Sequence, residues 1–129
     1  QVGTTCGLNM RCLLTDMNSP LGENAGNALE VVECINVMRG EGPASTTDLS
    51  VRLAAECVAL AFPDRGVADI SARMRDSLRS GRALELFGRI IAAQGGDVRV
   101  LDNPTLMGRA PCVADLSSPA AGFVARIDT

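Results

Sequence analysis

Residues 11–31 read RCLLTDMNSPLGENAGNALEV, and this stretch sets the expected fold class. It begins with a short apolar run at 11–15 that has turn-forming residues on both sides. Such a run predicts a buried strand, and its continuous apolar character favours a parallel one. Residues 15–18 then follow the carboxyl end of that strand, which faces the ligand crevice in open α/β sheets. We therefore expect an α/β arrangement with a site near these residues.

A helix is expected after an irregular connection. Pro20 and Gly22 oppose regular structure before Asn27, which is the expected N-cap. Gly40 is expected to end the helix. The apolar residues at helical spacing are Ala28, Val31, Ile35 and Met38.

Three further helices follow from the same kind of pattern. Ser45 and Asp48 have a spacing like that of a capping box and predict the start of the first of them. Its expected buried stripe is Leu49, Leu53, Cys57 and Leu60. The next two are expected at about 67–80 and 82–94, each ended by glycine.

Two short strands are expected near the C-terminus, at 111–116 and 122–127. An isolated hairpin is marginal in water, and a single parallel strand needs neighbours. We therefore expect their sheet partners to lie elsewhere, in a larger natural protein.

Composition excludes several kinds of chemistry. The 129 residues include 12 arginines but no lysine, histidine, tryptophan or tyrosine. Triads and dyads that use histidine, histidine metal sites and lysine Schiff bases are therefore excluded. The net charge of −3 and three phenylalanines disfavour nucleic-acid binding. No apolar run is long enough for a membrane span, and no signal peptide is visible.

The cysteines and arginines both have unremarkable interpretations. Five widely spaced cysteines without a C-x-x-C motif predict buried thiols in a reducing compartment, hence a cytoplasmic protein. A basic cluster, with Asp69, Asp76 and Glu85 interspersed, predicts a solvated helix face rather than an anion site. Its members are Arg73, Arg75, Arg79 and Arg82. The glycines at 22 and 26 precede a helix, but their spacing matches no phosphate-binding fingerprint.

Among the carboxylates, Glu33 is the most informative. It lies between Val32 and Cys34, so we expect it to be partly enclosed. An enclosed carboxylate needs a partner, which is an arginine or a metal ion. The irregular loop before the helix leaves backbone carbonyls free for a hard cation. An exposed or arginine-paired Glu33 is the alternative.

Several motifs in register resemble one family. TDMNSPLG at 15–22, GNALEV at 26–31 and GEGP at 40–43 resemble a region of thymidine and pyrimidine nucleoside phosphorylases. The likeness continues with GRALELF at 81–87 and AQGGD at 93–97. It extends to AGFV at 121–124 and IDT at 127–129. The resemblance implies that residues 1–110 belong to the α/β domain and 111–129 begin a C-terminal β-rich region. The expected segment is mainly helical, with one buried strand and a short C-terminal hairpin.

Members of this family reversibly cleave pyrimidine nucleosides with phosphate, giving the free base and a pentose 1-phosphate, and are usually dimers. The resemblance implies a pentosyltransferase without an organic cofactor. No residue of this chain matches the family's catalytic, phosphate-binding or base-reading positions, so the chain alone is expected to be inactive. A monovalent, potassium-like cation is implied at Leu21, Asn24 and Glu33. Asn24 stands where a small apolar residue is common.

Two alternatives remain open from the sequence. One is a relative that acts on nucleoside monophosphates or transfers phosphoribosyl groups to anthranilate. The GEGP and QGGD signatures disfavour the anthranilate branch. The other is a non-catalytic module derived from the same fold. A natural protein of about 45 kDa is expected from the family resemblance, since that size exceeds one domain.

Overall fold

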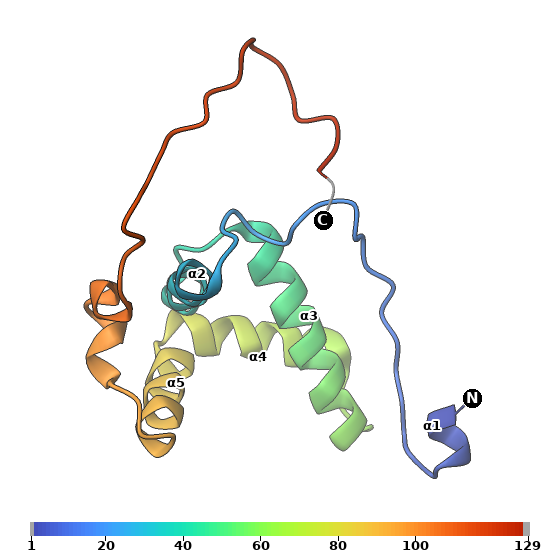
Figure 1. The fold of residues 1–129 in the computed structure, drawn as a ribbon. Coiled ribbons are helices and arrows are strands. Elements are labelled where there is room, and N and C mark those ends of the chain that lie inside the picture. Colours follow the sequence, from blue (N-terminus) through green and yellow to red (C-terminus); the bar gives the residue numbers. More distant parts are fainter. Residues whose placement is uncertain (1, 128–129) are drawn as a thin grey trace.

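The four longer helices of this chain form one cluster, while the short N-terminal helix and two extended segments lie outside it (Figure 1). The computed structural model describes residues 2–127. Its elements are α1 (Val2–Thr5), α2 (Asn27–Arg39), α3 (Ala44–Ala61), α4 (Val67–Arg79), α5 (Arg82–Ala93) and the 3-10 turns η1 (Val98–Leu101) and η2 (Pro104–Met107). The four longer helices lie within two residues of their expected positions.

The predicted strands are wrong. Residues 11–15, 111–116 and 122–127 are extended, but the described part of the chain, 2–127, contains no β-strand. A strand exists through hydrogen bonds to a neighbouring strand, and none of these segments has such a neighbour within residues 2–127. Their apolar side chains, such as Leu14, Leu116 and Phe123, are fully exposed. The α/β class is therefore replaced by an all-helical arrangement over these residues.

The N-cap of helix α2 lies one residue earlier than expected. Gly26 is the N-cap, and Asn27 is already the first helical residue. The carboxylate of Glu30 accepts a hydrogen bond from the Gly26 N–H at 2.9 Å, which satisfies a free donor at the helix start. Gly40 ends the helix as predicted, with its left-handed φ of 82° and its N–H bonded to the carbonyls of Asn36 and Val37.

The core lies between α3 and α4, on a different face of α3 from the predicted one. Ala55 and Ala59 of α3 pack with Ile70 of α4, and all three are fully buried. Leu53 is 45% exposed and Cys57 is exposed, so the predicted stripe is not the core face. Helix α3 is apolar on more than one side, so its periodicity fits two stripes. Small alanine side chains let the two helices approach closely, and this favours the observed face.

The expected capping box of α3 is also wrong. Pro43 is the N-cap, without a side-chain capping bond. Asp48 instead accepts a hydrogen bond from Arg75 of α4 at 2.8 Å. The carboxylate is therefore used between helices rather than at the helix end.

The extended N-terminal segment runs beside α3 (Figure 1). Arg11 donates to Oε2 of Glu56 on α3 at 2.6 Å, and Arg52 pairs with Oε1 of the same carboxylate at 2.6 Å. Asn9 and Met10 line a small pocket with Leu60. This segment thus lies along α3 near Glu56 and Leu60.

Two remaining expectations concern the surface. All five cysteines are free and exposed, so the prediction of buried thiols is wrong. No helix within residues 2–127 has the length and apolar character that crossing a membrane requires. The domain boundary at 110 stays a prediction, and Gln1, Asp128 and Thr129 lie outside the described residues.

Candidate functional site

The carboxylate of Glu33 holds the loop that precedes α2. Glu33 lies in the second turn of that helix and is only 6% exposed. Its Oε2 accepts hydrogen bonds from the N–H of Glu23 at 2.9 Å and from the N–H of Asn24 at 3.0 Å. The side-chain amide of Asn24 donates to the same oxygen at 2.8 Å. Three donors from two consecutive loop residues therefore converge on one oxygen.

The second oxygen of Glu33 joins the loop to α3. Thr46, in the first turn of α3, donates its hydroxyl to Oε1 at 2.9 Å. Gly22 lies against the same oxygen, because a Cβ built on Gly22 would be 1.8 Å from Oε1. Its φ of +79° is a left-handed conformation that favours glycine. We call Gly22, Glu23, Asn24, Glu33 and Thr46 the loop clasp.

Hydrogen bonding keeps Glu33 ionised. The Asn24 side chain, and after it the Glu23 N–H, hold the pKa of Glu33 below its ordinary value, although burial acts in the opposite direction. The predicted enclosure of Glu33 is confirmed. Its partners, however, are neutral donors of the loop and of α3, and no ion pair among the described residues includes it.

The three residues predicted to bind a cation lie together at this loop. Leu21 is half-exposed, Asn24 is partly buried, and both adjoin the Glu33 carboxylate through the clasp. Within residues 2–127, the carbonyls of Leu21 and Asn24 accept none of the identified hydrogen bonds. No group of three or more acidic or thiol side chains in this part of the chain is arranged to hold a metal ion. The monovalent cation stays a prediction.

A broad hollow of about 930 Å³ opens beside the clasp. Its lining includes Asp16, Leu21 and Asn24, with Leu49 of α3 and Ile127 from the far end of the chain. Asp16 accepts hydrogen bonds from the N–H and the side-chain amide of Asn18, at 2.9 and 2.5 Å. The residues expected to face a crevice therefore do line a hollow, although no strand leads to it.

Comparison with known proteins gives a consistent result. No protein-family model matches the chain. Proteins named pyrimidine-nucleoside phosphorylase, from Staphylococcus aureus strains USA300, NCTC 8325 and bovine RF122, are each 34% identical to it over 127 residues. The alignment covers 98% of this chain and 29% of each relative. Over nearly its whole length, the chain is similar to a segment of these pyrimidine-nucleoside phosphorylases. The resemblance expected from its motifs is confirmed, and the chain spans under a third of the length of these relatives.

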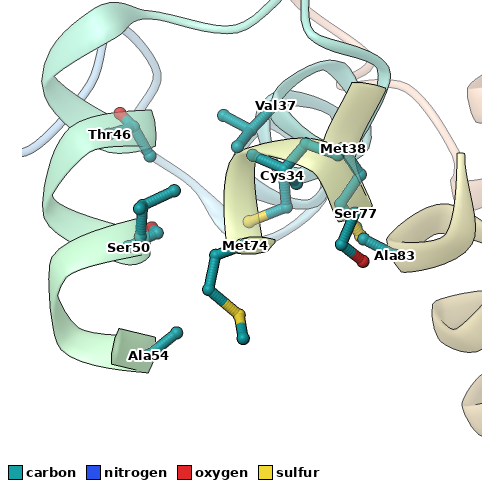
Figure 2. Close-up of a pocket in the computed structure, with 11 residues that line it drawn as sticks. Cys34, Val37, Met38, Thr46, Ser50, Ala54, Met74, Ser77 and Ala83 are labelled. Carbon is teal, nitrogen blue, oxygen red and sulfur yellow. The ribbon is translucent and has the colours of Figure 1, made fainter. Parts of the chain in front are cut away.

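A second pocket of the chain lies between α2, α3 and α4 (Figure 2). Its volume is about 330 Å³. Val37, Met38 and Met74 make it mainly apolar, and the Cys34 sulfur points toward its α3 side. None of its lining residues is charged. It therefore offers mainly packing surface, with the hydroxyls of Thr46, Ser50 and Ser77 as its polar groups.

Three of the four arginines of the basic cluster form ion pairs, and the fourth, Arg82, donates to the Ser80 hydroxyl at 3.1 Å. Arg73 pairs with Asp69 at 3.3 Å, Arg75 with Asp48 at 2.8 Å, and Arg79 with Asp76. These contacts agree with the predicted solvated face and leave the cluster poorly suited to anions.

Sequence reasoning missed two residues that make structurally important contacts. Thr46 belongs to the clasp, but nothing in its local pattern marks it, because its partner is 13 residues away. Glu56 is buried with 9% exposure and binds two arginines, which also lower its pKa. The i,i+4 spacing of Arg52 and Glu56 is the signal that could have found this pair.

Proposed function

We propose that this chain is part of an enzyme that cleaves pyrimidine nucleosides with inorganic phosphate. In this reaction the bond between C1′ of the sugar and the ring nitrogen of the base breaks. A phosphate oxygen forms a new bond to C1′, and the base leaves with the bonding electrons and takes up a proton. The products are the free base and a pentose 1-phosphate, so the enzyme is a pentosyltransferase.

One observation carries the proposal, which is the similarity to proteins named pyrimidine-nucleoside phosphorylase over 127 residues. Composition supports the proposal that the catalytic groups of the enzyme come from outside these residues. Without histidine, the segment lacks the side chain that most often moves a proton at neutral pH. We assign it no catalytic residue and no organic cofactor. Nucleoside and phosphate are the proposed partners of the whole enzyme.

The segment's proposed contribution is structural. The loop clasp fixes loop residues that line the hollow together with Asp16, and α2 supplies the Glu33 carboxylate at the centre of the clasp. Positioning of this kind can contribute strongly to rate when charged groups are supplied from elsewhere. We further propose a cytoplasmic homodimer for the complete enzyme.

Two proteins assayed side by side test the proposal. The natural gene product that contains these residues is expected to release thymine or uracil from thymidine or uridine only when phosphate is present. The purified 129-residue chain is expected to release neither. A folded gene product without phosphate-dependent release from any pyrimidine nucleoside would contradict the proposed function. Turnover by the short chain, free of contaminating enzyme, would contradict the proposal that the catalytic groups come from outside these residues.

A further inference from the structure

The buried charge of Glu33 is compensated in an unexpected way. A carboxylate has about four acceptor positions, two on each oxygen. Oε2 already receives three N–H donors, and Oε1 receives the Thr46 hydroxyl. Hydrogen bonds to a charged acceptor are the strong kind. The negative charge therefore has a nearly complete set of donors that all belong to the chain itself.

A cation at this carboxylate would compete with these donors. At Oε2 it would meet the positive ends of three N–H groups, which lie 2.8–3.0 Å from the oxygen. At Oε1 it would have to share the oxygen with Thr46, and Gly22 lies against the same atom. The donor set therefore fits a cation at Glu33 poorly unless the loop first opens.

Asn24 is the key member of the clasp. It bonds Oε2 twice, through its backbone N–H and through its side-chain amide. The side-chain amide places a positive dipole end on the carboxylate without bringing a net charge. Of the three donors on Oε2, only this one can be removed without altering the backbone, because the other two are backbone N–H groups.

We propose that the Asn24 side chain and Thr46 close the loop on Glu33 without a bound cation, so that the clasp is independent of monovalent ions. Asn24 is then a positioning residue for the hollow beside the loop, and it acts through Glu33. This proposal replaces the cation predicted from the sequence at Leu21, Asn24 and Glu33. It concerns the loop alone and does not rest on the proposed function.

Amide hydrogen exchange at Glu23 and Asn24 tests the proposal in the 129-residue chain. Exchange is followed by NMR in potassium, sodium and choline chloride at equal ionic strength, where choline is too large to enter the loop. We expect the same protection at both amides in all three salts. Protection that is absent in choline chloride would overturn the proposal, whatever the rest of the chain does.

A pair of variants isolates the side-chain amide. Asn24→Ala removes it and keeps the backbone N–H, and we expect exchange at Glu23 to accelerate about fivefold to tenfold in every salt. Asn18→Ala is the matched control, because Asn18 donates only to exposed Asp16, and it should leave Glu23 unchanged. Unchanged exchange at Glu23 in Asn24→Ala would overturn the role of the amide.

Discussion

Asn24 and Glu33 are joined by two hydrogen bonds to a single oxygen, one from the backbone of Asn24 and one from its side chain. The two residues are nine positions apart: Asn24 lies in the irregular loop before α2, and Glu33 lies in the second turn of that helix. Their contact therefore turns the loop from a flexible connection into a fixed part of the helix start. The loop residues that line the hollow are therefore held in place as well.

Loss of the Glu33 charge should release the loop. In Glu33→Gln one oxygen becomes an NH₂ group. At the Oε2 position this group would face three N–H donors, and at the Oε1 position it could not accept the hydrogen bond from Thr46. We expect exchange at the Glu23 and Asn24 amides to rise by about tenfold. Glu30→Gln is the control, because Glu30 is exposed and accepts only from Gly26. Equal exchange rates in the two variants would show that the clasp does not order the loop.

Two glycines with similar backbone angles allow the cost of backbone strain to be measured separately from the cost of a side-chain collision. Gly22 and Gly81 have φ values of 79° and 75°, but only Gly22 lies against Glu33, whereas Gly81 faces open space. Gly81→Ala should cost about 1–2 kcal/mol from its left-handed backbone. Gly22→Ala should cost clearly more, because its Cβ collides with Oε1. Urea unfolding measures both, and equal losses would argue against the close approach.

The buried face of α3 can be tested by truncation. Ile70→Ala should lower the free energy of unfolding by about 2–5 kcal/mol, because Ile70 is fully buried against Ala55 and Ala59. Leu53→Ala, on the predicted but exposed stripe, should lower it by about 1 kcal/mol or less. Thermal and urea unfolding give both values. A larger loss in Leu53→Ala than in Ile70→Ala would show that the stripe predicted from the sequence is the buried face of α3.

Stability should fall in acid. Glu33, Glu56 and Asp97 each have a pKa below the ordinary value, set by Asn24, by Arg11 and by Arg99 respectively as the largest cause. A lowered pKa in the folded state stabilises it above the unfolded value, about 4.5 for glutamate, and this gain is lost as pH falls below that value. Urea unfolding should therefore show stability constant above about pH 6 and declining below about 4.5. The double variant Glu33→Gln/Glu56→Gln should flatten the decline, and an unchanged slope would assign it to other groups.

Most helices could be predicted from the sequence, whereas their exact ends and faces could not. Gly40 ends α2 because only a left-handed residue fits there, and that signal is local. Asn27 and Ser45 resemble caps, yet Gly26 and Pro43 take those positions. For α3, an apolar pattern on several sides leaves the choice of face to its packing against Ile70.

Whether a strand forms, and which groups bond Glu33, could not be predicted from the local sequence pattern alone. The run at 11–15 has strand composition, but composition cannot supply the neighbour that a strand requires. The enclosure of Glu33 follows from its apolar flanks. Its donors come from Glu23, Asn24 and Thr46, which the chain brings together only when α2 and α3 pack. A carboxylate predicted to need a cation is satisfied by amides instead.

The product formed from phosphate tests the central claim most directly. Phosphorus NMR would follow the natural gene product, incubated with thymidine or uridine and inorganic phosphate. The account predicts a new pentose 1-phosphate signal that grows in step with free base, at equal amounts of the two. Release of base without this signal, or no release from any pyrimidine nucleoside by the folded protein, would contradict it.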